Sequence, residues 1–592
     1  MQAAPGRAEW IGPVHDGFQC GSKYNMYKEL QETIAEMTAP GQMFSITEVN
    51  VGGHPVKAWA MAPNSLRDIW LGTARHADAD YLVYRDERWT YAQAHEEVAR
   101  IANWLRATGI GQHDRVAIAM RNYPEWMLAY WAIASIGAVS VGVNAWWVPE
   151  ELKYGLMDSG TKLLICDAER LARFDQIRDD FADLRVAAVR VDDSPHWATP
   201  WSEVLATEPA LPEASIDPDD DACIFYTSGT TGNPKGARLT HRGCVNNILS
   251  VVFGTLSQAT AQAKALGKEP PNLLGGGRTQ LASIVATPLF HVTANNCLAQ
   301  TATMGGGKLV HMHKWDAGEA LRLIEEEKIT IFSGVPTMSR EIINHPDFAT
   351  RDTSTLTALN GGGAAVQPDL IGKIDHAGRG ARPGQGYGMT EVCGMISTST
   401  GFFLSDKPNS AGLVLPVYDV KCIDKAGNTL PRGQTGEICV RGSQVIKGYL
   451  NRPDATAETI VDGWLLTGDI GYIDEDNFIY LVDRAKDMVL RGGENVYCSE
   501  VETALYKHPD VAECTVFSVP DERLGEEVGA AIFPAPGTQP GAGELREFCK
   551  TQLAAYKAPR YIWILDEPLP RNASGKFVKR TLQESLDPGA AG

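Results

Sequence analysis

The stretch that decides the architecture of this chain runs from Phe225 to Gly236 and reads Phe-Tyr-Thr-Ser-Gly-Thr-Thr-Gly-Asn-Pro-Lys-Gly. The apolar residues 222–226 predict a buried strand that leads into a polar, glycine-rich loop. Hydroxyl side chains, glycines and one lysine make up the loop: Thr227, Ser228, Gly229, Thr230, Thr231, Gly232 and Lys235. Such groups direct hydrogen-bond donors and a positive charge at an anion, so we expect a phosphate-binding loop.

The order of residues in this loop differs from that of the common phosphate loop. The pattern Gly-x-x-x-x-Gly-Lys-Ser/Thr places its lysine directly after a glycine, whereas Asn233 and Pro234 separate Lys235 from Gly232. A solvated hairpin is the alternative for any cluster of Gly, Ser and Thr. The combination of hydroxyls, glycines and a lysine directly after a strand favours phosphate binding.

Length, charge and cysteine content limit the class of protein. A chain of 592 residues is too long for one compact core, so two or more domains are expected. The formal net charge of −19 argues against a partner such as nucleic acid, which would require a basic surface. The 11 cysteines, without a Cys-x-x-Cys pair, predict a reduced, cytoplasmic protein that lacks structural zinc. The sequence leaves the oligomeric state open, a homo-oligomer included.

One apolar segment, residues 126–147, is long enough to span a bilayer and has no charged side chain. Its second half alternates β-branched residues, which favours a helix that turns at Gly137 into a buried strand. The N-terminal residues lack the apolar core of a signal peptide. We therefore expect at most peripheral contact with a membrane.

From Ser65 onward, helical and strand patterns alternate along the chain, which is typical of layered α/β architecture with parallel strands. After Asp483 the pattern restarts in a stretch of about a hundred residues, the size of a small α+β domain. The expected division is an N-terminal extension at 1–64, a large α/β domain at 65–485 and a small C-terminal α+β domain at 486–592. Within the large domain, the alanine-rich residues 258–267 predict a short exposed helix.

Two predicted strands end in residues that suit a ligand site, since ligands bind at strand ends in α/β sheets. His291 follows Phe290 at the end of one strand, although a single histidine is more often structural. The run Gly361, Gly362, Gly363 and Ala364 would form a flat backbone wall for a planar base or an acyl chain. A simple turn is the alternative for this run.

The stretch 386–391 carries three different functional groups within five residues. Tyr387 offers an aromatic face for stacking, and Thr390 offers a hydroxyl for a phosphate. Glu391 is a hard oxygen ligand of the kind that Mg²⁺ prefers. The three together predict a magnesium–nucleotide site.

Three later stretches are ambiguous when each is considered alone. Asp469 ends a predicted strand, and its carboxylate could accept two hydrogen bonds from a ribose diol, with the Arg484 guanidinium nearby in the chain. Gly492 and Gly493 form a short glycine segment, and Lys576 follows Ser-Gly near the C-terminus. By composition these are charged or flexible surface turns.

In their order along the chain, these stretches resemble the signature motifs of the adenylate-forming superfamily, which includes acyl-CoA synthetases, beetle luciferases and peptide-synthetase adenylation domains. The resemblance extends roughly from Ser65 to Leu582 and is nearest to fatty-acid-type acyl-CoA ligases. It implies a large α/β domain and a small, mobile C-terminal domain. Neither residues 1–64 nor the alanine-rich stretch matches the family pattern.

The resemblance also implies a role for each candidate residue. The loop 227–235 and Thr390 would contact the phosphates of ATP, Glu391 would bind Mg²⁺ and Tyr387 would stack on adenine. Asp469 and Arg484 would bind the ribose, His291 would flank the carboxylate pocket and Lys576 would be the catalytic lysine. Gly492 and Gly493 would lie beside the pantetheine of CoA, and Lys486 would be the hinge between the domains.

The reaction implied is ATP-dependent activation of a carboxylic acid to acyl-AMP with release of pyrophosphate, followed by transfer to CoA. A fatty or other elongated apolar acid is the first expectation, because glycines 361–363 leave one wall of the pocket without side chains. The alternatives in the same class are an aryl or branched-acid CoA ligase and an adenylate former that transfers to an amine or a carrier protein. A non-catalytic nucleotide-binding regulator is the alternative of another class. The complete set Lys235, Glu391, Asp469, Arg484 and Lys576 argues against it.

Overall fold

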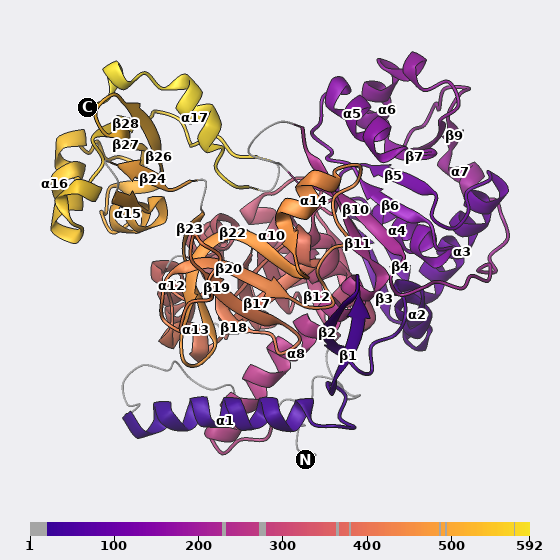
Figure 1. Ribbon diagram of the computed structural model, residues 1–592. Helices are drawn as coiled ribbons and strands as arrows, with labels where there is room; N and C mark the ends of the chain where they lie inside the picture. The colour runs from indigo at the N-terminus through magenta and orange to yellow at the C-terminus, as the bar shows by residue number, and fades with distance from the viewer. Residues whose placement is uncertain are drawn as a thin grey trace. The chain divides into compact units, whose positions relative to one another are not determined.

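The computed structural model describes residues 20–227, 233–270, 280–362, 366, 368–377, 380–484, 487–491, 494–572 and 575–592. They fold into two compact units (Figure 1). The first contains the chain up to Asp419 together with Arg441–Leu465, and the second contains Val420–Val440 and Leu466–Gly592. The boundary expected between residues 485 and 486 lies outside the described residues and stays a prediction.

The first sheet of the first unit is almost entirely parallel, as the alternation of helices and strands predicts. Its order is β11-β10-β6-β5-β7-β8-β9, with bounds Lys235–Thr240, Asp221–Thr227, Val139–Gly142, Arg115–Ala119, Leu163–Asp167, Arg185–Val189 and Thr199–Pro200. Only β11 is antiparallel to its neighbour within this described sheet, and it forms the sheet edge. The associated helices are α2 (Leu66–Gly72), α3 (Tyr91–Ala107), α4 (Pro124–Ser135), α5 (Pro149–Ser159), α6 (Ala168–Asp175) and α7 (Trp201–Val204). The predicted strand before the glycine-rich loop is β10 and is confirmed.

The apolar segment at residues 126–147 is a buried helix followed by a buried strand. All residues of α4 are buried, Gly137 turns the chain with φ +73°, and β6 continues inside the sheet. Burial on all sides explains the lack of charge, because no face of this helix is left for polar residues. The predicted turn at Gly137 is confirmed. Among the described residues, no helix combines the length and the hydropathy that crossing a bilayer requires.

The second sheet of the first unit has a parallel centre. Its order is β18-β17-β16-β15-β14-β12-β13-β3-β4, with bounds Gly412–Val414, Gly394–Thr400, Arg382–Met389, Ala358–Gly362, Ile331–Gly334, Ala282–Val285, Lys308–His311, Asp80–Tyr84 and Glu87–Thr90. The strands from β3 to β16 are parallel. Helices α9 (Gln300–Met304), α10 (Ala317–Glu326), α11 (Pro336–Asn344) and α12 (Pro368–His376) belong to this part of the chain, as does a π-helix at Thr293–Ala299. Its core includes Val83, Ile284, Val310, Phe332 and Leu359.

The turn between β16 and β17 depends on a close backbone contact at Gly388. A Cβ on Gly388 would lie 1.7 Å from the carbonyl oxygen of Gly394. Cys393, with φ 58°, and Gly394, with φ +147°, turn the chain between the two strands. Glycine is therefore the residue that allows this hairpin to close.

We predict that Gly388→Ala destabilises the first unit by at least the roughly 1–3 kcal/mol that overpacking costs, because backbone atoms must move to admit the methyl group. Thermal unfolding followed by circular dichroism measures the change. Gly372→Ala in α12 is the matched control, since no atom lies within 4 Å of its added Cβ. The control should unfold at the same or a higher temperature, and equal midpoints for both variants would contradict the steric explanation.

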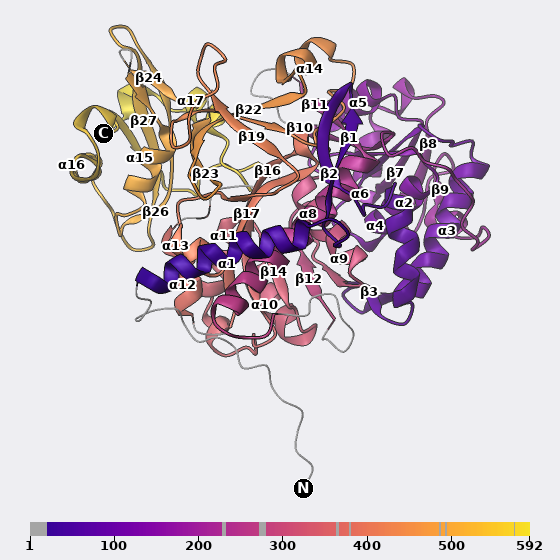
Figure 2. The same ribbon diagram turned by 60° about the horizontal axis from the view of Figure 1, so that its bottom comes forward.

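The N-terminal segment 1–64, which the family pattern does not explain, is folded where the structure describes it. Helix α1 (Cys20–Thr38) packs along α8 (His241–Ala265), and the two lie side by side in both views (Figures 1 and 2). Met26, Leu30 and Thr33 are buried on one face of α1. A hairpin of β1 (Ile46–Val51) and β2 (His54–Trp59) follows. Trp59 donates from its indole N–H to Ser250 of α8 at 3.0 Å.

The expectation of a short exposed helix at residues 258–267 is wrong. These residues continue α8 without a break to Ala265, and Gln258, Ala261 and Ala263 are buried. The Gln258 amide donates to the carbonyl of Thr398 at 3.0 Å, and Lys264 forms an ion pair with Glu36 of α1. Alanine has the highest helix propensity in any environment, so composition does not distinguish a covered helix from an exposed one.

We predict that Leu30→Ala costs about 2–5 kcal/mol, or detaches α1 from α8, because a side chain that is 2% exposed leaves a cavity. Thermal unfolding and limited proteolysis with mass spectrometry measure the two outcomes. Glu32→Ala on the exposed face of the same helix is the control, with a 51% exposed side chain and an expected change within about 0.5 kcal/mol. Equal protease sensitivity of both variants would contradict the packing role of α1.

The strands of the second unit fall into two groups. One has the order β19-β20-β22-β23, with bounds Asp419–Ile423, Gly436–Arg441, Trp464–Ile473 and Phe478–Arg484. The other has the order β25-β24-β27-β26, with β28 beside β27, and bounds Glu494–Val496, Val489–Arg491, Gly525–Pro534, Val511–Asp521 and Tyr561–Ile564. Its helices are α15 (Cys498–Leu505), α16 (Ala542–Gln552) and α17 (Lys579–Ser585). The predicted combination of a large layered α/β part and a smaller α+β part is confirmed.

Candidate active site

Several predicted residues meet at one edge of the second sheet of the first unit. The parallel strands β12, β14, β15 and β16 are consecutive neighbours, so the segments that follow them emerge at the same edge. Gly361 and Gly362 end β15. A Cβ on Gly362 would lie 3.7 Å from the Thr293 methyl, in the π-helix that begins shortly after His291. The structure therefore brings the His291 segment and the glycine wall together.

The position of His291 is set by an asparagine that sequence reasoning missed. Asn122, which follows the first-sheet strand β5, is buried and donates to the carbonyls of Val285 and Thr287 at 3.1 and 2.9 Å. Its side-chain oxygen accepts the Leu289 N–H at 3.1 Å. Phe290 packs edge-on against Trp146, with ring centroids 5.6 Å apart. These contacts fix the loop that carries His291, whose side chain is half-buried.

The ends of the glycine-rich loop are paired across the β10–β11 hairpin. Thr227 lies opposite Lys235 in the register, and its hydroxyl donates to the Lys235 carbonyl at 3.4 Å. The two strands thus place the first hydroxyl and the lysine of the loop side by side. Ser228, Gly229, Thr230, Thr231 and Gly232 lie outside the described residues.

Glu391 and Lys235 both contact Tyr449, a residue that sequence reasoning also missed. The Tyr449 hydroxyl donates to Glu391 Oε1 at 2.8 Å. The Lys235 ammonium nitrogen lies 4.6 Å from the centre of the Tyr449 ring. Burial, together with the charge of Glu391, raises the pKa of Tyr449, so its hydroxyl stays protonated and donates. Tyr449 stands directly after Gly448 without any local pattern that marks it.

The other residues of the 386–391 stretch lie at the end of β16 and just beyond it. Tyr387 and Thr390 are buried, with exposed fractions of 9% and 8%. The Glu391 carbonyl accepts the Ile446 N–H at 3.0 Å. The backbone and the side chain of Glu391 are thus both held by the segment 446–449.

The donor set at Glu391 fits Mg²⁺. A carboxylate oxygen is the ligand type that Mg²⁺ takes from proteins, usually one or two carboxylates with waters and phosphate oxygens completing the shell. No sulfur or nitrogen donor is needed for such a site. The hydrogen bond from Tyr449 orients the carboxylate in the way that outer-shell partners orient metal ligands.

The second unit places Asp469 and Arg484 opposite each other. They are cross-strand neighbours on β22 and β23, and Arg484 Nε lies 3.1 Å from Asp469 Oδ1. Asp469 is buried, whereas the Arg484 side chain is 57% exposed. The expectation that Asp469 ends a strand is wrong, because β22 continues to Ile473. Within this strand the Thr467 hydroxyl accepts the Asp469 N–H at 3.1 Å, beside Gly468 with φ +70°. The expected proximity of the two residues is present, and their role toward ribose stays a prediction.

Lys576 lies in a small turn of the second unit. Its N–H donates to the Asn572 side chain at 3.0 Å, and Arg571 pairs with Phe577 across the turn. Arg571 also reaches Glu513 at 2.7 Å, which fastens the base of the turn to β26. Lys576 itself is half-buried. The predicted catalytic lysine therefore sits on a braced turn.

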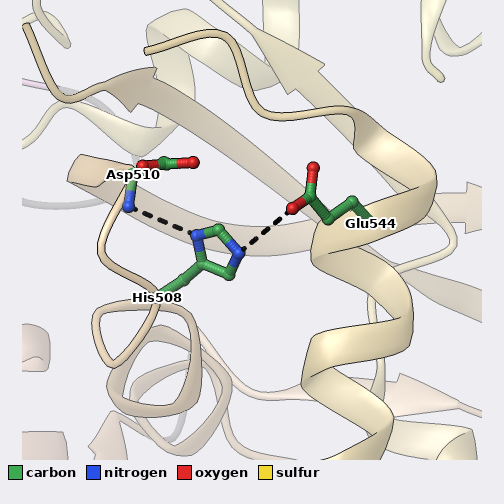
Figure 3. Close-up of side chains that lie close together, drawn as sticks. All are labelled: His508, Asp510 and Glu544. Carbon is green, nitrogen blue, oxygen red and sulfur yellow. Dashed lines mark hydrogen bonds and ion pairs between the residues drawn. The ribbon is translucent and has the colours of Figure 1, made fainter.

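The remaining candidates lie outside the described residues and stay predictions: Gly363, Ala364, Lys486, Gly492 and Gly493. A separate cluster of His508, Asp510 and Glu544 in the second unit was not predicted (Figure 3). His508 Nδ1 accepts the Asp510 N–H at 3.3 Å, and Nε2 faces Glu544 at 3.7 Å. Both ring nitrogens are thus engaged within the protein, and we interpret the cluster as a link between the end of α15 and α16.

Comparison with known proteins agrees with this arrangement. The family model described as AMP-binding enzyme matches residues 71–450, and the model described as AMP-binding enzyme C-terminal domain matches residues 500–576. Feruloyl-CoA synthase of Amycolatopsis sp is 35% identical over 529 residues, which cover 89% of this chain and 97% of that protein. 4-Coumarate–CoA ligase 3 of Oryza sativa subsp. japonica is 32% identical over 508 residues, which cover 85% of this chain and 88% of that protein.

Among solved structures, the crystal structure of the anthranilate CoA ligase AuaEII in complex with anthranoyl-AMP superimposes with a TM-score of 0.79. It is 25% identical and covers 88% of this chain and 97% of that one. The fold, the family model and the relatives all confirm the resemblance that the motifs predict. This chain belongs to the AMP-binding enzyme family.

Proposed function

We propose that this enzyme activates an aromatic carboxylic acid with ATP and transfers the acyl group to CoA. The chain is an AMP-forming acid–thiol ligase that uses ATP, Mg²⁺ and CoA. The main support for an aromatic substrate comes from two relatives, the feruloyl-CoA synthase and the 4-coumarate–CoA ligase. Both are named for aromatic acids, and both match this chain along most of their length. The glycine wall at the end of β15 agrees with it, because a planar ring can lie flat on a backbone without side chains.

The expectation of a fatty acid as first choice, and the role in lipid metabolism that it would imply, have no support in these relatives. Gly362 leaves the side of β15 that faces Thr293 without a side chain, and this favours a flat substrate as much as a long one. The sequence alone did not distinguish these two shapes. The aryl-acid alternative replaces the fatty acid.

In the proposed first step the acid attacks the α-phosphate of ATP, which forms acyl-AMP and releases pyrophosphate. Positioning and electrostatic stabilisation supply most of the catalysis in such a displacement. The Lys235 ammonium and the Thr390 hydroxyl contact phosphate oxygens, and Asp469 and Arg484 hold the ribose. Glu391 would hold Mg²⁺, which would supply positive charge to the phosphates. Lys576 stabilises the charge that develops around the α-phosphate.

In the second step the thiol of CoA attacks the acyl carbonyl, and AMP leaves as a stable phosphate monoester. This step requires a different set of contacts, so we propose that Lys576 acts in the first step only. The family's hinge position, Lys486, is proposed to serve the change between the two steps.

Unpaired cysteines, from Cys166 to Cys549 among the described residues, support a reducing compartment such as the cytoplasm.

We predict that aromatic acids such as ferulic, 4-coumaric and anthranilic acid are activated with kcat/KM about tenfold or more above that of octanoic to palmitic acid, because pocket shape discriminates by this order of magnitude. Pyrophosphate release with an acid panel, with and without CoA, measures the preference. Thioester formation only in the presence of CoA identifies the acceptor.

Three outcomes of this panel would contradict the proposal in different ways. A preference for long aliphatic acids would restore the fatty acid. Product formation with an amine or a carrier protein and none with CoA would favour the other acceptor class. Binding of ATP without pyrophosphate release for any acid would support a nucleotide-binding regulator.

We predict that Lys576→Ala lowers the rate of acyl-adenylate formation about a hundredfold or more, the loss expected for one preorganised charge in a transition state. The same variant should convert supplied acyl-adenylate and CoA to thioester at nearly the wild-type rate. Single-turnover assays of each half-reaction measure the two rates. Lys550→Ala on α16, a lysine that pairs with Glu547, is the control and should retain both rates. Equal loss of both half-reactions in Lys576→Ala would show that this lysine does not act in adenylation alone.

A further inference from the structure

The segment 446–450 forms an additional ladder along β11, the edge strand of the first sheet. The Lys447 N–H donates to the Arg238 carbonyl, and the Arg238 N–H donates to the Gly448 carbonyl, both at 3.0 Å. The Leu450 N–H donates to the Gly236 carbonyl at 2.8 Å, and Tyr449 bridges to Ala237. Main-chain pairing therefore fixes Tyr449 opposite Ala237 of β11. Lys235, the lysine of the glycine-rich loop, stands two residues before Ala237 in the same strand.

Contacts on other sides hold the same tyrosine in place. Its N–H donates to the Thr456 hydroxyl at 2.9 Å, in helix α14 (Pro453–Thr459). Its exposed fraction is 8%. Because Tyr449 is buried and the residues on either side of it pair with β11, its side chain has one rotamer available. Its hydroxyl and its ring face therefore point in fixed directions.

Those directions keep two opposite charges apart. The hydroxyl binds Glu391 Oε1, while the face of the same ring lies under the Lys235 ammonium at 4.6 Å. In the part of the chain that the structure describes, Lys235 and Glu391 form no ion pair with each other. A direct pair would neutralise the carboxylate that binds the metal and the ammonium that contacts phosphate.

We infer that Tyr449 is a positioning residue that keeps Glu391 ready for Mg²⁺ and Lys235 ready for the phosphates. The inference rests on the proposed function, because it assigns these two ligands to the site. A hydrogen bond to one oxygen orients the carboxylate and leaves its second oxygen for the metal. The cation–π contact is weaker than an ammonium–phosphate contact, so the lysine transfers to the nucleotide when ATP binds.

Two substitutions separate the hydroxyl from the ring. Tyr449→Phe removes the hydrogen bond to Glu391 and keeps the face under Lys235. Tyr449→Leu removes both, which allows Lys235 to approach Glu391. Tyr91→Phe is the matched control, because it deletes a buried tyrosine hydroxyl that donates to the Gly307 carbonyl at 2.8 Å, in the same unit but away from the site.

Isothermal titration of ATP into the full-length protein at several Mg²⁺ concentrations is the primary test, and electron paramagnetic resonance of Mn²⁺ in the presence of ATP is a second. We expect Tyr449→Phe to raise the metal concentration for half-maximal ATP binding about ten- to a hundredfold, the loss that removal of an outer-shell partner of a metal ligand causes. Tyr449→Leu should raise it more than Tyr449→Phe does. Tyr91→Phe should leave the metal dependence at the wild-type value, whatever it does to the unfolding temperature.

A double-substitution cycle tests whether the hydroxyl acts through the carboxylate. In a Glu391→Gln background, Tyr449→Phe should add little or nothing to the loss, because the charged acceptor is already absent. An unchanged metal dependence in Tyr449→Phe, or its full effect in the Glu391→Gln background, would overturn the inference. Wild-type protein that binds ATP with Mg²⁺ and activates no acid would instead refute the proposed function and leave this test valid.

Discussion

The contact that the site depends on joins Glu391 to the segment 446–449. Glu391 follows the last parallel strand of the second sheet, and the segment pairs with the edge strand of the first sheet. One backbone and one side-chain hydrogen bond join Glu391 to the segment 446–449. They therefore hold the end of β16, in the second sheet, beside β11 and Lys235 of the first sheet. The glycine-rich loop and the Glu391 carboxylate belong to different sheets, so their mutual position rests on this connection.

Parallel strands explain why the other groups collect at the same place. Their carboxyl ends must share one edge, so residues that are far apart in the chain become neighbours without any direct pairing between them. The glycine wall after β15 and the turn after β16 arrive there through strand order alone. Glycine is required where backbones approach each other, as at Gly388, where the opposing strand leaves no room for a side chain. The positions of the candidate site residues are thus set by the backbone geometry of the sheet.

Local patterns predicted much of this structure. The strand before the glycine-rich loop and the turn at Gly137 follow from short stretches of residues and their order. Tyr449 and Asn122 were missed because each acts across a long sequence separation, to Glu391 and to the 285–289 loop. No hydrophobic period or glycine pattern encodes such a contact. The alanine-rich part of α8 was misjudged for a related reason, since its cover comes from α1 and from Thr398, far away in the sequence. The substrate class was also beyond the sequence, because an absent side chain does not specify what fills its place.

Helix α1 matters for expression of a shortened chain that contains only the residues matched by the family models. The family model begins at residue 71, and the curated relatives match only part of the chain. A gene cut at that point would expose the part of α8 against which α1 packs. An exposed apolar surface of this kind promotes aggregation. Poor yield or aggregation of such a version would then reflect the loss of α1, the β1–β2 hairpin with Trp59 and most of α2, and an expression plan that retains these elements avoids it.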